Sequence, residues 1–128
     1  MAGLSDYAEN KLLDHVLGKT SFTMPTNVRV ALFTAAPSDA GGGTEVSGGS
    51  YARQAIVVNS SSGGATNPNA DVVFPVATAS WGTITHVGIF DATTGGNLLM
   101  WAALTTSKTI ASGDQLVFPA ADLDFSID

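Results

Sequence analysis

The segment THVGIFDATTGGNLLMWAAL, residues 85–104, decides the fold class of this 128-residue chain. Two strongly apolar runs, which include Val87 and Leu98–Trp101, flank a short Asp–Thr–Thr–Gly–Gly segment. The apolar runs suit strands packed in a sheet, while Asp91 can bond nearby backbone amides and Gly95–Gly96 permit positive φ angles. We therefore predict a β-hairpin in which the neighbours of the Gly pair do the packing. The Gly pair itself is interpreted as a bend and not as a binding site.

Short apolar runs separated by turn residues continue on both sides of this hairpin. Strands are predicted at 27–34, 51–59, 71–76, 82–92, 96–104, 114–120 and 122–128. Two Gly-rich and Ser-rich segments, at about 35–50 and 60–70, are predicted to be flexible loops. This spacing is typical of an all-β fold, and we predict a single jelly-roll-like β-sandwich over residues 27–128 with about seven or eight antiparallel strands.

The N-terminal segment carries the helical periodicity of the chain. Leu4, Ala8, Leu12 and Val16 recur at every fourth position, with Leu13 and Leu17 beside them. Ser5 suits an N-cap and Gly18 suits a C-terminal stop, so we predict one amphipathic helix at about 4–17. Because a helix of this length is marginal alone, its apolar stripe needs a partner surface.

Composition limits the possible functions. The chain has 45% hydrophobic residues and only 12% charged residues, which favours a subunit that covers much of its surface in an assembly. It has no cysteine, which excludes disulfides and thiolate chemistry, and its net charge is −6 without a cluster of basic residues, which disfavours nucleic-acid binding. No secretory signal or membrane span is visible, so we expect a protein that is made in the cytoplasm and has no membrane partner. The length of the chain, without an internal repeat or a linker, predicts a single domain, residues 1–128.

Two Gly-containing motifs suggest phosphate binding only superficially. Gly18–Thr20 resembles the end of a phosphate-binding loop, but the required earlier Gly is replaced by Leu13 and the strand–loop–helix order is reversed. We interpret Gly18 as the helix stop. The segment GGGTEVSGG, residues 41–49, has Glu45 at its centre and is interpreted as a loop that orders against a neighbouring subunit.

The side chains that could carry catalysis or bind a metal lack a supporting pattern. Ser80, His86 and Asp91 have the residue types of a hydrolytic triad but no nucleophile elbow, and His15 lies beside the helical stripe. Asp122 and Asp124 share one face of a predicted strand and could hold Ca²⁺, but the remaining framework of a calcium loop is missing. We therefore predict no catalytic, cofactor or metal residue and no small-molecule substrate.

The two tryptophans, Trp81 and Trp101, bracket the opening segment. They are interpreted as core or interface anchors and not as a platform for sugars.

Four strings of the sequence together resemble small virion proteins of tailed bacteriophages. They are GLSDYAENKLLDHVLGKTSF (3–22), VRVALFTAAPSDAGGGTEVSGGSYARQAI (28–56), FPVATASWGTITHVGIFDATTGGNLLMWAALTTSKTIASGDQLVF (74–118) and ADLDFSID (121–128). Ala102 or Ala103 stands where related sequences often have Gly. Members of this group are described as capsid decoration (cement) proteins, head fibres or tail fibre components, and the resemblance implies no enzymatic activity.

The resemblance implies a non-enzymatic structural protein of the virion. A small acidic β-domain with one helix suits a capsid decoration protein on the outer head surface, with the major capsid protein and copies of itself, as a homotrimer, for partners. The alternative is a tail fibre or baseplate component involved in host attachment, in which the loops at 35–50 and 60–70 contact the host.

Overall fold

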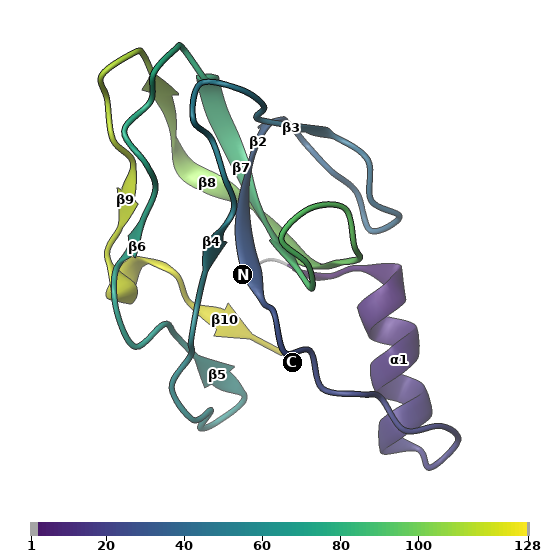
Figure 1. Cartoon of the computed structure of the whole chain (residues 1–128). Coiled ribbons are helices and arrows are strands. Elements are labelled where there is room, and N and C mark those ends of the chain that lie inside the picture. The colour runs from purple at the N-terminus through teal and green to yellow at the C-terminus, as the bar shows by residue number, and fades with distance from the viewer. Residues whose placement is uncertain (1–2, 128) are drawn as a thin grey trace.

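A six-stranded antiparallel sheet forms the larger layer of the molecule (Figure 1). The computed structural model describes residues 3–127. The sheet has the order β1–β8–β7–β2–β3, and a sixth strand, β4, also pairs with β2. Its long members are β2 (Arg29–Ala35), β7 (Gly82–Phe90) and β8 (Leu98–Ile110), and its short members are β1 (Gly3–Leu4), β3 (Thr44–Glu45) and β4 (Gln54–Ala55).

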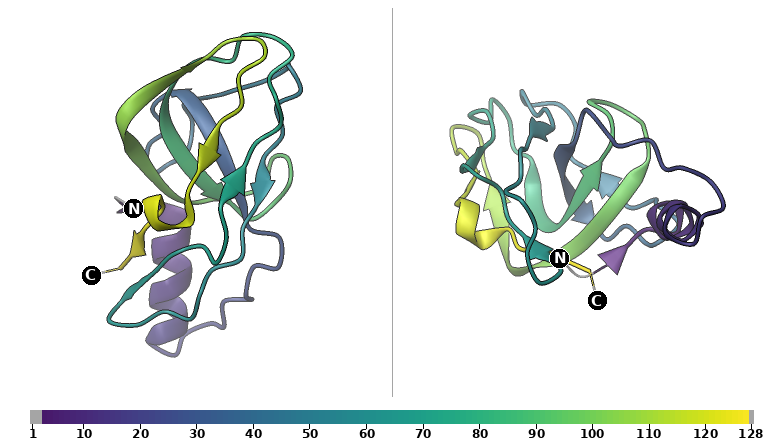
Figure 2. Two further views of the ribbon diagram at one scale, coloured as in Figure 1. Left: turned by 90° about the vertical axis from the view of Figure 1, so that its left-hand side faces the viewer. Right: turned by 90° about the horizontal axis from the view of Figure 1, so that it is seen from below.

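Two small two-stranded sheets face this layer. One pairs β6 (Val72–Val73) with β9 (Val117–Phe118), and the other pairs β5 (Ala65–Thr66) with β10 (Phe125–Ser126). The views in Figure 2 show β6, β9 and the connecting segments lying over the curved large sheet. The predicted all-β sandwich is confirmed, although the strands of its smaller layer are much shorter than predicted.

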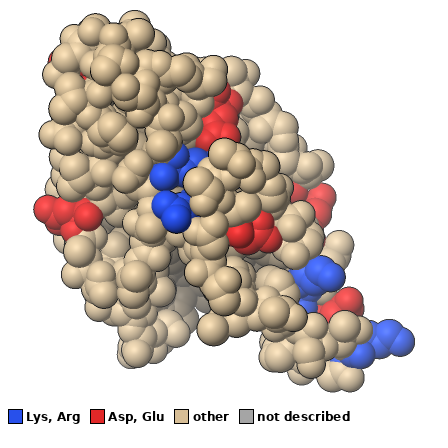
Figure 3. All heavy atoms as spheres, viewed as in Figure 1, with Lys and Arg blue, Asp and Glu red and all other residues tan. Residues whose placement is uncertain are grey.

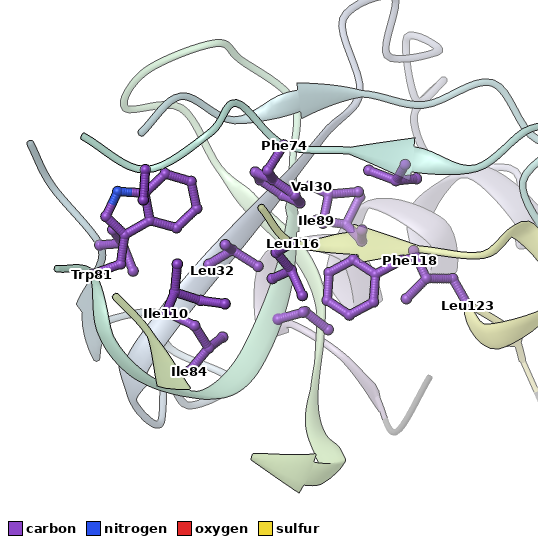
Figure 4. Close-up of a cluster of buried hydrophobic side chains, with 14 of the residues drawn as sticks. Val30, Leu32, Phe74, Trp81, Ile84, Ile89, Ile110, Leu116, Phe118 and Leu123 are labelled. Atoms are coloured by element: carbon purple, nitrogen blue, oxygen red, sulfur yellow. The ribbon is translucent and has the colours of Figure 1, made fainter. Parts of the chain in front are cut away.

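The hydrophobic core lies between the two layers (Figure 4). Side chains from the large sheet, including Val30, Leu32 and Ile89, point towards Phe74 and Phe118 from the smaller layer. These side chains are almost fully removed from water, and burial of each contributes about 1.5 to 3 kcal/mol before the entropy cost of ordering. The core therefore holds the short strands of the smaller layer in place where their own ladders are too short to do so.

The predicted hairpin at 85–104 is the centre of the large sheet. β7 and β8 pair from Phe90↔Leu98, next to the turn, to Gly82↔Ile110 at the far end of the hairpin. β2 pairs with the other edge of β7. The register shifts between Ile89 and Phe90, where β8 has one extra residue, and this bulge allows both Leu98 and Leu99 to be buried although they are consecutive.

A second, wider irregularity divides β8. Ile84 pairs with Lys108 and His86 with Ala103, so Thr85 alone lies opposite residues 104–107 of β8. The strand therefore continues to Ile110, beyond its predicted end at 104, but it leaves the regular ladder halfway along its length.

The predicted helix is present as α1 (Asp6–Val16). Ser5 caps it, because its hydroxyl accepts from the amide of Ala8 at 3.1 Å, and the φ of +79° at Gly18 follows its end. Within α1 only Ala8 is buried, so most of the predicted apolar stripe does not pack against the sheet. Among residues 3–127 no helix has the length and apolar character of a membrane span.

The closing segment differs from the prediction of one strand at 122–128. A short 3-10 helix, η1 (Ala120–Asp122), replaces its start, and β10 contains only Phe125–Ser126. Leu123 and Phe125 are buried as their alternation predicted, whereas Ile127 is exposed. Asp128 lies outside the described residues. The predicted loops at 35–50 and 60–70 contribute β3 and β5 to the sheets.

Candidate functional site

A groove of about 620 Å³ opens beside the hairpin turn, and we call it the Arg53 groove. It is lined by the start of α1 (Ser5, Asp6, Tyr7), the loop from Asp39 to Gly43, the side chains of Phe33, Glu45, Arg53 and Phe90, and the turn from Gly95 to Leu98. The groove brings together segments that are up to about ninety residues apart in the sequence. A volume of this size lies within the range of small-ligand sites.

Arg53 organises the groove from a buried position. It is 7% exposed, and its Nε and one Nη donate to the two carboxylate oxygens of Glu45 at 2.8 Å each. The other Nη donates to the carbonyl oxygens of Ala92 and Gly95 at 3.0 and 2.8 Å. The guanidinium also lies 3.8 Å from the centroid of the Phe90 ring. Four of its five N–H groups are therefore occupied within the chain, which leaves little capacity for an anionic ligand.

Tyr51 connects this ion pair to the core. Its hydroxyl donates to Glu45 Oε2 at 2.6 Å and accepts from the amide of Leu32 at 3.0 Å. Its ring stacks on Phe74 with centroids 6.3 Å apart and meets Trp81 edge-on at 5.6 Å. The position of Glu45, and through it that of Arg53, is thus set by buried aromatic packing.

The pKa values of the three groups keep the network in one protonation state. Burial raises the pKa of Glu45, but the hydrogen bonds from Arg53 and Tyr51 and the charge of Arg53 outweigh burial and hold this pKa below its usual 4.5. The hydrogen bond to Glu45 raises the pKa of Arg53, and burial together with the same carboxylate raises the pKa of Tyr51 far above its usual value. All three pKa values move away from neutral pH, so the network is suited to holding structure and not to exchanging protons.

The turn at 91–97 forms one wall of the groove. The Asp91 carboxylate accepts from the backbone amide of Asn97 at 2.7 Å and from its side-chain amide at 3.0 Å. Gly96 has a φ of +73°, and a Cβ there would lie 2.6 Å from both Ala92 Cβ and Asp91 Oδ1. The segment is therefore the bend that was predicted, and it also borders a groove that the sequence did not indicate.

Three carboxylates lie at the outer edge of the groove. Ligand oxygens of Asp6, Glu9 and Asp39 lie within 4.8 Å of one another, and all three residues are exposed. Trp101 Nε1 donates to Asp39 Oδ1 at 2.9 Å, and the backbone amide of Asp6 donates to the carbonyl oxygen of Asp39 at 2.9 Å, which places Asp39 beside the start of α1. Exposed acidic groups of this kind are common without a ligand, and their spacing in the sequence offered no signal for the cluster.

The residues of the triad considered above have other partners. Ser80 and Asp91 stand six and five residues from His86 along one extended segment, which corresponds to roughly 15 to 20 Å at about 3.3 Å per residue. His86 Nδ1 bonds Thr85 Oγ1 at 2.8 Å, and Ser80 Oγ accepts from the amide of Gly82 at 3.2 Å. The described contacts thus do not bring the three groups together.

Two further candidates have structural surroundings. His15 Nδ1 accepts from the amide of Phe22 at 3.0 Å, which fastens the segment after α1. Asp122 belongs to η1 and Asp124 precedes β10, so the expectation that both carboxylates share one face of a strand is wrong. The physical reason is Pro119, which begins the 3-10 turn in place of an extended ladder.

The tryptophans and the Gly-rich motifs complete the set of predicted sites. Trp81 is a core residue whose Nε1 donates to the carbonyl of Gly49 at 2.9 Å, and Trp101 is half-buried. Gly18 follows the helix end, as predicted for the GKT motif. Residues 41–49 contain β3 and supply Glu45 to the groove.

The sequence analysis missed the Glu45–Tyr51–Arg53 network. A usable signal was present, because Glu45 is a lone acid in an otherwise uncharged Gly-rich segment and Arg53 is one of only five basic residues. A chain with so few charges has few ways to place an acid and a base out of solvent except as a pair.

Comparison with known proteins gives one informative match. The model of a family described as "Podophage GP4 fiber I protein gp80" matches residues 3–126. No curated protein matches the chain.

Proposed function

The chain belongs to the podophage GP4 fiber I protein gp80 family, and on this premise we propose that it serves as a structural subunit of a phage fibre. The family is one of phage fibre proteins and not of enzymes, and the protein is a structural component associated with the virion. The family match along nearly the whole chain is the observation that supports the fibre role. In this role the protein contacts copies of itself and neighbouring virion proteins.

The surface of the molecule is suited to such an assembly. Figure 3 shows that charged side chains occupy only a small part of the face viewed there, in the middle of the view and at its right and left edges. Large apolar residues are exposed in several parts of the chain, among them Leu17, Met24, Val57 and Val76. Because sparse charge and exposed apolar side chains favour association, this surface supports a subunit that is partly covered in the virion.

A second candidate role is capsid decoration on the outer head surface, with the major capsid protein as partner. It is favoured by the net charge of −6, which suits a surface turned away from packaged DNA. The homotrimer expected for this role stays a prediction.

The location and the copy number in purified virions separate the two roles. Antibody labelling should place the protein on the tail or its fibres, and quantitative mass spectrometry should find at most a few dozen copies per virion, as the symmetry of tail structures dictates. Labelling spread over the head, with hundreds of copies, would contradict the fibre role and support decoration.

Host attachment is tested separately with the purified protein. If the fibre role includes attachment, the protein should bind host cells and slow phage adsorption, whereas a heat-denatured sample should do neither. Unchanged adsorption at saturating protein would restrict the proposal to a structural role.

A phage carrying His86→Ala should retain full infectivity, because the described contacts give this histidine no catalytic partner.

A further inference from the structure

Helix α1 has three sides with different surroundings, and its periodicity of 3.6 residues per turn sets which residues share a side. The side towards the sheet carries Ala8, the buried residue of the helix, and the half-buried Leu12. A second side is covered by the segment that follows the helix. The third side, which we call the open side, carries Asp6, Glu9, Leu13, Val16 and the C-cap residue Leu17.

The second side is partly covered by Phe22, in the segment that follows the helix. Phe22 lies edge-on to the Tyr7 ring with centroids 6.3 Å apart, and its amide donates to His15 Nδ1 at 3.0 Å. Lys11 Nζ lies 5.7 Å from the Tyr7 ring centroid on the same side. The returning segment therefore packs on the side of α1 that is roughly opposite the open side.

The open side presents large apolar groups to solvent. Leu13 is 58% exposed, Val16 73% and Leu17 77%. Figures 1 and 2 show that α1 extends beyond the sandwich, so the sheets do not cover this side. An isolated helix of this length is marginal, and the exposed leucines would leave water if the helix acquired a partner.

The polar residues of the open side indicate which partner fits. Asp6, Glu9, Leu13 and Val16 follow one another at spacings of three, four and three, so the acidic residues occupy the N-terminal half of the same stripe. Lys19 lies three residues after the last residue of α1, and Figure 3 shows Lys or Arg side chains, with an acidic group between them, at the lower right, where Figure 1 places this end of α1. The stripe is thus acidic at one end, apolar in its C-terminal half, and followed by a base.

We propose that the open side of α1 binds the open side of α1 in a second copy of the chain, with the two helices antiparallel. A two-fold axis near Leu13 and Val16 places these apolar residues against each other and brings Glu9 of each copy close to Lys19 of the other. A parallel arrangement would instead place Glu9 against Glu9 and leave Lys19 without an acidic neighbour in the pair. The charge pattern therefore selects the antiparallel pair.

The contact is modest in size and acts together with other contacts in an assembly. A helix of 11 residues is about 16 Å long at about 1.5 Å per residue, so the pair buries less than the about 1,200 Å² at the lower end of stable, specific interfaces. Such a contact joins copies that are already held close together, and it can link two larger assemblies across its two-fold axis. The inference concerns self-association and does not depend on whether the virion location is fibre or head.

The first test measures the number of chains per particle by sedimentation and light scattering of the full-length protein. The wild-type protein at high micromolar concentration should contain an even number of chains, and the double variant Leu13→Gln with Leu17→Gln should contain half that number. Val57→Gln is the matched control, because Val57 is also exposed but lies far from α1 in the sequence. A monomeric wild-type protein, or a variant that keeps the wild-type number, overturns the proposal.

The second test determines the orientation of the helices. The chain contains no cysteine, so single cysteines report only the contact into which they are introduced. Under mild oxidation, a mixture of Glu9→Cys and Lys19→Cys chains should form the mixed disulfide in preference to either symmetric one. A preference for the symmetric Glu9→Cys product would mean parallel helices, and no disulfide under conditions where particles assemble would mean a contact elsewhere; either result overturns the antiparallel pair.

Discussion

At the scale of single residues, Arg53 illustrates how one side chain sets the shape of a surface. It neutralises Glu45, holds two carbonyl oxygens of the hairpin turn and covers one face of Phe90. A lysine could supply the charge but not the planar fork that makes these bonds simultaneously. The groove therefore depends on the guanidinium group and not only on its charge.

Replacing Arg53 by Met should lower the free energy of unfolding by about 3 kcal/mol, because it leaves the partly buried Glu45 carboxylate without its cation. Arg53→Lys should recover only part of this loss. Urea denaturation at neutral pH measures both values. Lys108→Met, at an exposed position of β8, is the control and should change stability by less than about 0.5 kcal/mol. Equal stabilities of the Met and wild-type proteins would contradict the structural role of the network.

Gly88 is a second residue with a specific spatial requirement. An added Cβ would lie 2.8 Å from Phe33 Cε1 and 3.0 Å from Leu98 Cδ1, so Gly88→Ala should destabilise the protein by about 1 to 3 kcal/mol. Gly3→Ala is the matched control, since nothing lies within 4 Å of its added Cβ. Thermal unfolding of the two variants compares them directly, and a loss of stability at Gly3 alone would be inconsistent with the packing described.

At the scale of elements, the sequence was sufficient where one segment contained the whole pattern. The helix and the central hairpin were predicted because their periodicities and turn residues are local, as in Ser5, Gly18 and Gly96. The short strands of the smaller layer were overestimated, because apolar runs such as 71–76 fill the core without forming long ladders. The Arg53 groove was not predictable from spacing, since Asp6, Arg53 and Asn97 meet only through the tertiary fold.

Ser5 connects the helix to the sheet, and its replacement tests how firmly α1 is attached. Its hydroxyl donates to the carbonyl oxygen of Leu98 in β8 and accepts from the amide of Ala8. Ser5→Ala should therefore cost about 1 to 2 kcal/mol and should speed hydrogen exchange of the α1 amides more than that of the β7 amides. Ser21→Ala, in the segment after the helix, provides the control. Unchanged exchange in α1 would show that the cap does not attach the helix.

At the scale of the whole molecule, acid should weaken the fold through Glu45. The pKa of this group is lowered on folding, so its contribution to stability is present above its unfolded value of 4.5 and is lost as the pH falls through the folded pKa. Glu45→Gln should be less stable than wild type at about pH 7, and this difference should shrink towards about pH 3. Urea denaturation of both proteins across this range measures it. A difference independent of pH would mean that the carboxylate charge is not what stabilises the network.

The irregular course of β8 has a consequence for a protein that is crowded among its own copies. A long edge strand offers a row of free amide and carbonyl groups, and many copies held side by side could join along such edges without limit. Residues 104–107 interrupt this row, because they leave the ladder opposite Thr85 and are followed by the charged Lys108. Beyond the short pairing with β1 at Met100 and Trp101, the outer edge of β8 is thus a poor template for another strand. The bulge helps to prevent strand-to-strand association of β-sandwiches along this edge. An assembly of these subunits then forms through side-chain contacts, which can give a closed and limited number of copies.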